Sequence, residues 1–223
     1  MDFNSSVVNT NQSGVHSDVS YIVKKNKNNS YKRPISKHNI NAYEQAMSKT
    51  TSKKIIFDSG CGKGKSTQKL AYQYPDCFII GIDKSELRLK KSFANKDQII
   101  KNFCIVRADL VDFWRLATED GLKLENHFIF YPNPWPKKNH LKRRWHCSPV
   151  FKNIIQLGGR LEIRTNWKIY LDEFSLALSE YRLRSENRLY LPKNNNYLSD
   201  FEEKYHKSGH DLWKLTTDIN NMV

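Results

Sequence analysis

The stretch DSGCGKGKSTQ, residues 58–68, separates two kinds of nucleotide-binding fold. Its end, GKS at residues 64–66, resembles the end of the triphosphate-binding loop G-x-x-x-x-G-K-[ST]. That loop needs four residues between its first glycine and its Gly-Lys pair. The required position holds Ser59, and counting from Gly60 leaves only three residues. The stretch therefore does not read as a triphosphate loop.

The same stretch contains the pattern D-x-G-x-G-x-G, formed by Asp58, Gly60, Gly62 and Gly64, directly after the apolar run KIIF. Glycines let the backbone turn sharply after a strand and let a ligand approach it closely. The next apolar run, FIIGID, ends in Asp83, about twenty residues after the glycines. An acid there can accept hydrogen bonds from both hydroxyls of a ribose.

A third apolar run ends in Asp109, where a carboxylate could meet an adenine amino group. Asp58 would suit a ligand amine and would repel a triphosphate. Acids at three successive strand ends thus describe an adenosine ligand without phosphates. S-adenosylmethionine fits this description, because it carries a ribose, an adenine, an amine and a sulfonium cation. NAD fits less well, because the spacing is G-x-G-x-G and not G-x-G-x-x-G.

Short apolar runs alternate with helix-length segments from about residue 53 onward. The runs occupy residues 54–59, 77–83, 103–109, 127–132 and 159–166. Such alternation predicts βαβ units and a parallel sheet. Two late strand-like segments, 181–190 and 211–219, have no convincing helix between them and suggest an antiparallel addition at one edge. The predicted fold is α/β: a Rossmann-like, doubly wound, mostly parallel sheet with an antiparallel edge strand.

The overall charge of the chain favours an acidic partner. Lys and Arg number 37 against 23 Asp and Glu among 223 residues, which gives a net charge of +14. Such an excess is typical of proteins that bind nucleic acid.

Residues 1–31 are rich in Asn and Ser and show no repeating apolar face, so we expect a disordered tail. Residues 32–223 form the predicted domain.

Several classes of protein are disfavoured. The N-terminus has no apolar signal region and no apolar run approaches the length of a membrane span, so we expect a cytoplasmic protein without membrane contact. The four cysteines form no C-x-x-C pair, and H-E-x-x-H is absent, so we expect no metal site. G-x-S-x-G is also absent, which disfavours a serine hydrolase. We expect a monomer or a weak homodimer.

The fourth apolar run leads into FYPNPWPKKNHLKRRW, residues 130–145. The NPWP segment predicts a stiff turn at the carboxyl end of a strand, where open α/β sheets place their reactive groups. A dense basic segment follows it. Trp135 in that turn could stack on a base or fill the core, and the sequence favours neither.

The chain resembles the bacterial tRNA (guanine-N7)-methyltransferases. Their signature, Pro-Asp-Pro-Trp-Pro-Lys-Lys-x-His-x-Lys-Arg-Arg, is matched by PNPWPKKNHLKRR at every position but one. The segments RPISKHNINAYEQA, RTNWKIYLDEF and LSDFEEKYHKSGHDLWKL resemble the entry helix, the Thr-Asp-x-x-x-Tyr element and the Thr-x-Phe-Glu segment of that family. The resemblance covers about residues 32 to 215.

The resemblance implies a role for each matching residue. Asp58, Asp83 and Asp109 fall where the family holds S-adenosylmethionine, and Asn133 falls on the catalytic aspartate, which also belongs to the cofactor site. The expected contacts with tRNA are Lys137, Lys138, Arg143, Arg144, Asn166, Ser199 and Glu202. Asn133 and Asn166 replace aspartates of the family, and Ser199 replaces a threonine. The implied reaction is methylation of N7 of guanosine 46 in the tRNA variable loop.

Two alternatives stay open at this point. An Asn-Pro turn followed by an aromatic residue partly resembles the (Asp/Asn)-Pro-Pro-(Tyr/Phe/Trp) motif of amino-group methyltransferases, in which Asn133 would accept a hydrogen bond from an exocyclic amine. The loss of the aspartate charge at Asn133 would also suit a tRNA-binding homologue with weakened catalysis. Retention of all three cofactor acids favours an enzyme.

Overall fold

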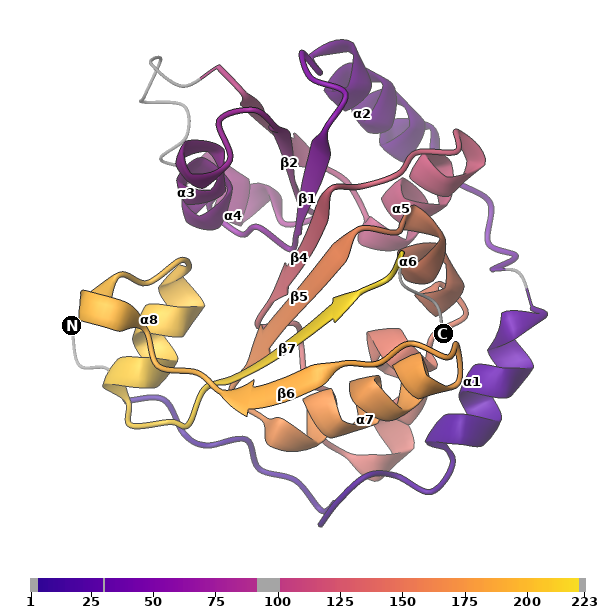
Figure 1. Cartoon of the computed structure of the whole chain (residues 1–223), viewed down its shortest axis with the longest axis vertical. Helices are drawn as coiled ribbons and strands as arrows, with labels where there is room; N and C mark the ends of the chain where they lie inside the picture. The colour runs from indigo at the N-terminus through magenta and orange to yellow at the C-terminus, as the bar shows by residue number, and fades with distance from the viewer. Residues whose placement is uncertain (1–3, 30, 92–100, 221–223) are drawn as a thin grey trace.

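The fold is a central sheet covered by helices on both faces, as a computed structural model shows (Figure 1). The structure describes residues 4–29, 31–91 and 101–220. The parts of the predicted tail at 1–3 and 30, and of the predicted domain at 92–100 and 221–223, lie outside the described residues. The strands are β1 (Ile55–Ser59), β2 (Phe78–Asp83), β3 (Phe103–Arg107), β4 (Asn126–Phe130), β5 (Arg160–Thr165), β6 (Glu186–Leu189) and β7 (Trp213–Asp218).

The strands lie in the order β3-β2-β1-β4-β5-β7-β6. The first five are parallel to one another, whereas β7 runs antiparallel to both β5 and β6. Every residue of β1, β2 and β4 is buried, which explains why these strands appear as unbroken apolar runs. The predicted mostly parallel sheet with an antiparallel addition at one edge is confirmed.

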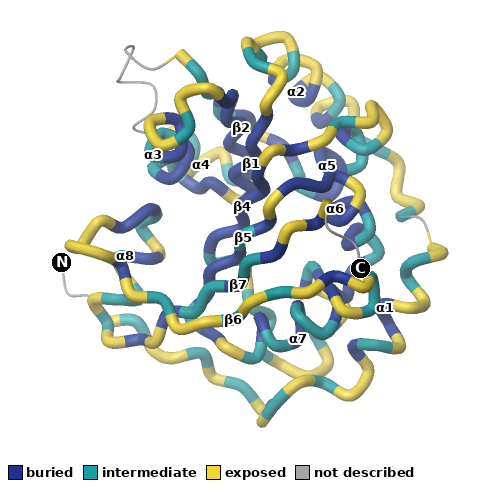
Figure 2. The backbone as a smooth tube through the Cα atoms, in the orientation of Figure 1, coloured by how far each residue is buried: buried dark blue, intermediate teal, exposed yellow. Residues whose placement is uncertain are grey.

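The helices are α1 (Val19–Lys27), α2 (Lys37–Ser48), α3 (Lys65–Gln73), α4 (Glu86–Lys90), α5 (Leu110–Glu119), α6 (Phe151–Leu157), α7 (Lys168–Ser179) and α8 (Asp200–Lys207). Short 3₁₀ helices occur at η1 (Lys138–Arg143), η2 (Trp145–Cys147) and η3 (Lys193–Asn195). The larger core lies between the sheet and α1, α2, α5, α6 and α7, and a smaller one lies under α3 (Figure 2). Alternate residues of β1 supply both, since Phe57 joins the larger core and Ile56 the smaller.

One helix between the two late strands was not predicted. α8 follows β6 and precedes β7, and its sequence DFEEKYHK is mostly polar. Its start is capped by Ser199, whose Oγ accepts a hydrogen bond from the backbone N–H of Glu202 at 3.1 Å. The spacing S-x-x-E is a signal for the start of a helix, and it was present in the sequence.

The N-terminal segment differs from its prediction. Within the described residues 4–29 the chain is folded, and α1 packs against α7 and η2. Val19, Ile22 and Val23 are buried against the larger core. Their spacing of i, i+3 and i+4 is that of an amphipathic helix. The prediction of a disordered tail was wrong for these residues, because three apolar side chains among many polar ones gain enough burial when α7 supplies the partner surface.

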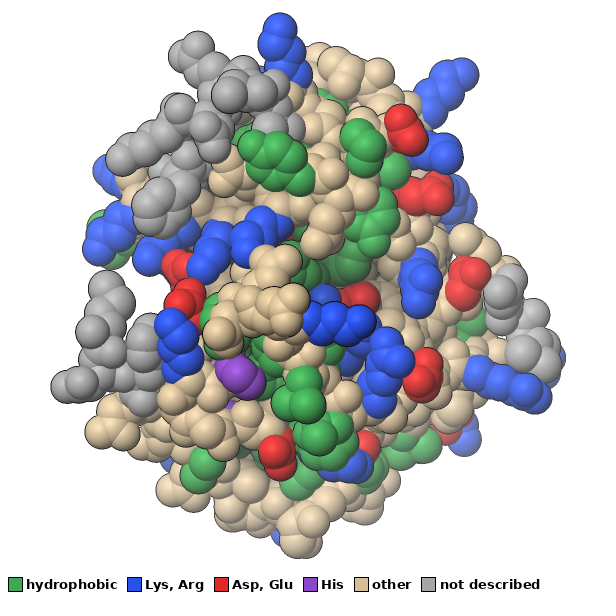
Figure 3. Space-filling model, turned by 60° about the vertical axis from the view of Figure 1, so that its left-hand side comes forward, with side chains coloured by type: hydrophobic (Ala, Val, Ile, Leu, Met, Phe, Trp, Pro, Cys, Tyr) green, Lys and Arg blue, Asp and Glu red, His purple; other side chains and the backbone are tan. Residues whose placement is uncertain are grey.

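The surface reflects the charge of the chain. On the face shown in Figure 3, Lys and Arg side chains lie around a central area of hydrophobic side chains. No helix among the described residues is both long and apolar enough to cross a membrane. In the same residues, no group of three or more His, Cys, Asp or Glu side chains is arranged to hold a metal ion. All four cysteines are buried free thiols.

Candidate active site

The glycine turn connects β1 to α3 at the carboxyl edge of the sheet. Gly60, Gly62 and Gly64 have φ values of 85°, 61° and 82°, in the left-handed region that favours glycine. The N–H of Gly60 donates to the carbonyl of Ile82 at 2.8 Å, and that of Gly62 donates to Asp83 Oδ2 at 3.0 Å. The backbone of the turn is therefore hydrogen-bonded to the end of the neighbouring strand β2.

Asp58 has a different position from the one its pattern suggested. Its side chain is 1% exposed, and Oδ2 accepts hydrogen bonds from Ser66 Oγ at 2.6 Å and Thr67 Oγ1 at 2.7 Å. Burial raises the pKa of this carboxyl to about 6, against the opposing effect of the two hydroxyls. Asp58 lines neither of the cavities at this edge. Its carboxyl joins the first turn of α3 to the end of β1.

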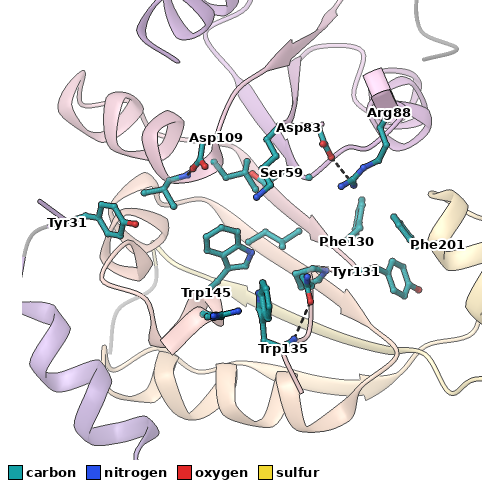
Figure 4. A pocket seen from close by; sticks show the side chains of 18 of the residues that line it. Tyr31, Ser59, Asp83, Arg88, Asp109, Phe130, Tyr131, Trp135, Trp145 and Phe201 are labelled. Carbon is teal, nitrogen blue, oxygen red and sulfur yellow. Dashed lines mark hydrogen bonds and ion pairs between the residues drawn. The ribbon is translucent and has the colours of Figure 1, made fainter. Parts of the chain in front are cut away.

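A cavity of about 390 Å³ opens at the carboxyl ends of β1, β2 and β4 (Figure 4). This is where ligands bind in open α/β sheets. One part of its wall comes from the ends of β1, β2 and β3, and the other from the segment after β4. The lining residues that were predicted are Gly60, Asp83, Asp109, Asn133, Trp135 and Arg143. The structure therefore brings both halves of the predicted site to one cavity.

Asp83 is the more deeply buried of the two acids that line this cavity. Its side chain is 4% exposed, yet it lines the cavity. Oδ1 accepts a hydrogen bond from Ser85 N–H at 2.8 Å, and Oδ2 accepts the one from Gly62. The guanidinium of Arg88 lies 3.3 Å from Oδ2 (Figure 4). Backbone donors on both oxygens fix the carboxylate so that its remaining lone pairs can meet a ligand.

Asp109 stands at the start of α5 on the same wall. Its Oδ1 accepts a hydrogen bond from Val111 N–H at 2.9 Å, which caps the helix. The guanidinium of Arg33 lies 3.6 Å from the same oxygen. About a third of the Asp109 side chain remains exposed, so the carboxylate can accept a further hydrogen bond from a ligand.

Sequence reasoning missed several lining residues. Tyr31, Arg33, Arg88, Trp145 and Phe201 all line the cavity. Phe201 lies inside the segment LSDFEEKYHKSGHDLWKL that carried the family resemblance, and its 40% exposure marks it as an unusual surface aromatic. Arg33 begins the segment RPISKHNINAYEQA and Trp145 ends the segment of residues 130–145, so the sequence had drawn attention to both segments. Tyr31 and Arg88 had no such signal.

The loop after β4 carries strained backbone. Tyr131 and Trp135 have φ values of 50° and 47°, a region that non-glycine residues seldom adopt. Such strain persists only where surrounding contacts hold it, and it clusters at functional sites. Asn133 lies between them, exposed, and its Oδ1 accepts a hydrogen bond from Trp135 N–H at 3.4 Å. Trp135 lines the cavity, and the guanidinium of Arg143 lies 4.7 Å from the centre of its ring.

A buried ion pair holds the start of this loop. Arg164 Nη1 donates to Glu202 Oε1 at 2.7 Å, and Glu202 is fully buried. The hydroxyl of Tyr131 donates to the same Oε1 at 3.4 Å, and the N–H of Tyr131 donates to the carbonyl of Arg164 at 2.7 Å. The predicted contact of Glu202 with tRNA is therefore replaced by an internal role, because both of its oxygens already accept buried hydrogen bonds.

A second buried ion pair holds the end of the loop. Arg144 and Glu173 are both fully buried, with Nη1 and Oε2 2.5 Å apart. Nε and Nη2 of Arg144 donate to the carbonyl of Trp135 at 3.2 and 3.1 Å. Burial by itself would raise the pKa of Glu173, but His146 and Arg144 outweigh it and lower this pKa to about 2. The prediction that Arg144 contacts tRNA is therefore not supported by its position, since the guanidinium is fully used inside the protein.

The remaining predicted tRNA contacts lie at or near the surface. Lys137 and Lys138 are exposed. Asn166 is half-buried, with its Nδ2 2.9 Å from Nδ1 of His210. Ser199 caps α8 and lines a second cavity of about 220 Å³ beside the glycine turn. These residues come from three segments after β4.

Comparisons with known proteins agree with this geometry. A family model described as "Putative methyltransferase" matches residues 52–215. The chain is 29% identical over 170 residues to the tRNA (guanine-N(7)-)-methyltransferase of Pseudoalteromonas atlantica, covering 72% of this chain and 70% of that one. It is 28% identical over 166 residues to the enzyme of the same name from Methylobacillus flagellatus, covering 72% and 69%.

Solved structures share the fold. A structure of the 16S rRNA methyltransferase KamB superposes with a TM-score of 0.56 at 16% identity, covering 83% of this chain and 94% of that one. A 16S rRNA (adenine(1408)-N(1))-methyltransferase variant from Catenulisporales acidiphilia, solved with its cosubstrate SAM, gives a TM-score of 0.52 at 14% identity, covering 79% and 88%. With the family match over most of its length, the chain belongs to the class I methyltransferase family that includes the tRNA (guanine-N7)-methyltransferases.

Proposed function

We propose that this chain transfers the methyl group of S-adenosylmethionine to N7 of a guanosine in tRNA, by resemblance guanosine 46 of the variable loop. One observation carries the proposal: the cavity joins the acids of β2 and β3 to the Asn133 loop. The first group suits the donor nucleoside, and the second presents polar and cationic side chains to a base. The relatives named tRNA (guanine-N(7)-)-methyltransferases support this choice of substrate.

The cavity fits the methyl donor in size and in chemistry. About 390 Å³ lies within the range of small-molecule sites. Asp83 would accept hydrogen bonds from the ribose hydroxyls, as acids at this position do in nucleoside-binding sheets. Asp109 would accept one from the adenine amino group. When bound, S-adenosylmethionine supplies a methyl group on a positively charged sulfur.

The reaction asks little proton chemistry of the protein. Guanine N7 already has a lone pair, so a new N–C bond can form as the C–S bond breaks and its electron pair passes to sulfur. The site has to align N7 with the methyl carbon at about 3–3.5 Å. Asn133 would act as the catalytic residue by offering its side-chain carbonyl to the purine, which becomes cationic. It lacks the charge of a carboxylate, so we expect a slower reaction than an aspartate would support.

The tRNA would approach from the side of the basic segment. Arg143 lines the cavity, and Lys137 and Lys138 are exposed in the same segment. Lysine and arginine bind phosphates through charge. Arg143 also stacks on Trp135, so the pair presents a flat cationic surface beside the cavity.

The test is incubation with methyl-labelled S-adenosylmethionine and bulk tRNA, followed by digestion and nucleoside analysis. The proposal predicts label in N7-methylguanosine. Label in a nucleoside methylated on an exocyclic amine would support the amino-group alternative through Asn133. Binding of tRNA without label in any nucleoside would support a homologue that has lost catalysis. A tRNA lacking guanosine at position 46 should remain unlabelled if that position is the target.

A further inference from the structure

We propose that the N-terminal segment, residues 5–16, supports the active site from behind the Asn133 loop and that Gln12 is a positioning residue for this loop. This segment precedes residues 52–215, the part matched by the family model. The inference rests on the proposed function for its activity measurement alone. Its structural basis is a set of contacts between this segment and the loop.

The first contacts join the segment to the loop backbone. Thr10 Oγ1 donates a hydrogen bond to the carbonyl of Pro136 at 2.7 Å. The Oδ1 of Asn11 accepts one from the backbone N–H of Lys138 at 3.1 Å. These contacts join residues more than 120 positions apart. They fix both the end of the strained turn and the start of η1.

Gln12 completes the buried ion pair behind the loop. Its side chain is 5% exposed. Its Oε1 accepts a hydrogen bond from Arg144 Nη2 at 3.0 Å, and its Nε2 donates to Glu173 Oε1 at 2.5 Å. The amide of Gln12 thus bridges the two charged partners, and Arg144 in turn holds the carbonyl of Trp135. Without this amide, a buried donor and a buried acceptor would each lose a partner, which is costly.

The segment also reaches the other side of the substrate region. Nε2 of His210 lies 2.7 Å from the carbonyl of Ser5, and its Nδ1 lies 2.9 Å from Asn166. His16 N–H donates to Glu173 Oε1 at 3.0 Å, next to the contact made by Gln12. Residues 5–16 therefore touch the supports of the loop and the neighbour of Asn166 in one continuous stretch.

The functional consequence follows from the strain in the loop. A backbone with two left-handed non-glycine residues keeps its shape only while its surroundings determine it. Asn133 is exposed and lies between those residues, and its hydrogen bond with Trp135 N–H is made within the loop itself, so its position depends on what holds the loop. A small displacement of a positioned group can lower the rate of a reaction by orders of magnitude. Contacts from residues 10–12 therefore bear on the rate of methyl transfer and not on binding of the donor.

The experiment compares three variants of the full chain: Gln12→Ala, Thr10→Val and Asn26→Ala. Asn26→Ala is the matched control, because Asn26 also donates a side-chain amide hydrogen bond from this part of the chain, to the carbonyl of Cys147 at 3.0 Å, outside the loop. Thr10→Val keeps the size of the side chain and removes the hydroxyl contact, so it guards against a folding defect in the buried Gln12 variant. Each variant is measured for kcat on tRNA, for dissociation of S-adenosylmethionine and for amide hydrogen exchange of residues 131–145.

We expect Gln12→Ala to lower kcat about tenfold or more, with a smaller loss for Thr10→Val. Both should exchange faster at residues 131–145, while affinity for S-adenosylmethionine and the control stay at wild-type values. Wild-type kcat and exchange in both variants would overturn the inference. Faster exchange across the whole chain would also overturn it, because the role would then be general stability. If the wild type transfers no methyl group to tRNA, the proposed function fails, and loop exchange alone decides this inference.

Discussion

The two walls of the cavity are built in different ways. The wall that we propose for the donor comes from the ends of three neighbouring strands, and Asp83 and Asp109 are placed there by adjacent backbone turns. The wall that we propose for the substrate is a strained loop, held by two ion pairs whose acids, Glu173 and Glu202, lie far away in sequence. Glu202 supports Tyr131 at one end, and Arg144 supports Trp135 at the other. Local spacing thus determines the first wall, and tertiary packing determines the second.

The buried acids behind the two walls show the same contrast. Burial raises the pKa of Asp58 to about 6, because its partners are neutral hydroxyls. Glu173 is also buried, but His146 and Arg144 lower its pKa to about 2. At a pH between these two values Asp58 is protonated, whereas Glu173 is charged. Above pH 6 both acids are charged, but Glu173 has a cationic partner in Arg144 whereas the partners of Asp58 are hydroxyls, so the loop depends on a complete ion pair.

The largest expected effect separates the two acids on the donor side. Asp83→Asn should weaken binding of S-adenosylmethionine about 100-fold, because the ribose hydroxyls would lose a charged acceptor and meet an amide donor in place of one carboxylate oxygen. Asp58→Asn is the matched control, since it makes the same chemical change at the same edge of the sheet. Calorimetric titration of both variants measures the difference. Equal losses would show that Asp58 contacts the ligand after all.

The second expected effect is on the pH dependence of the free energy of unfolding, again measured with the Asp58→Asn variant. The folded pKa of Asp58, about 6, lies above its ordinary value of 3.8. The folded chain therefore binds more protons than the unfolded chain between these values, and the free energy of unfolding falls as pH rises through this window. The contribution is about 2–3 kcal/mol. In urea unfolding from pH 4 to 7, Asp58→Asn should lack this decline, and parallel curves for the two proteins would contradict it.

The third expected effect concerns Asn133 in the loop after β4. Asn133→Asp adds a carboxylate where positive charge develops on the purine, so we expect kcat for N7 methylation to rise about tenfold or more. Affinity for S-adenosylmethionine should change little, because Asp83 lies on the other wall. Single-turnover rates with tRNA measure the change. An unchanged or lower rate would mean that Asn133 does not face the reacting base.

The smallest effect belongs to the rim of the substrate wall. Lys137→Ala should weaken tRNA binding several-fold and reduce the slope of log K against log salt by about 1, as the loss of one phosphate contact does. Lys53→Ala is the control, because Lys53 is exposed just before β1 begins, at the opposite edge of the sheet. Filter binding between low and moderate salt gives both slopes. The same slope change in both variants would place tRNA docking elsewhere.

Much of the fold could be predicted from the sequence for a physical reason. Strands buried on both faces leave unbroken apolar runs, and Gly60, Gly62 and Gly64 mark the sharp turn after the first of them. The acids at the ends of β2 and β3 could be predicted from the same alternation of apolar runs and helix-length segments. The position of Asp58 could not be predicted, because the pattern does not show whether a carboxylate points to a ligand or to the hydroxyls of Ser66 and Thr67.

The substrate half was harder to predict, because its residues act through distant partners. In the basic segment, Arg143 and Arg144 are neighbours with the same chemistry, yet one lines the cavity and the other is fully buried against Glu173. Gln12 has no motif at all, and its contacts with Arg144 and Glu173 depend on the tertiary packing of the segment that precedes α1. The spacing of Val19, Ile22 and Val23 could have revealed that helix.

A crystal structure of the chain with S-adenosylhomocysteine tests most directly whether the two walls of the cavity enclose the donor. We expect both ribose hydroxyls within hydrogen-bonding distance of the Asp83 carboxylate, the adenine beside Asp109, and the sulfur facing the side of the cavity formed by Asn133. A nucleoside bound away from Asp83, or a sulfur turned away from the Asn133 loop, would contradict the account.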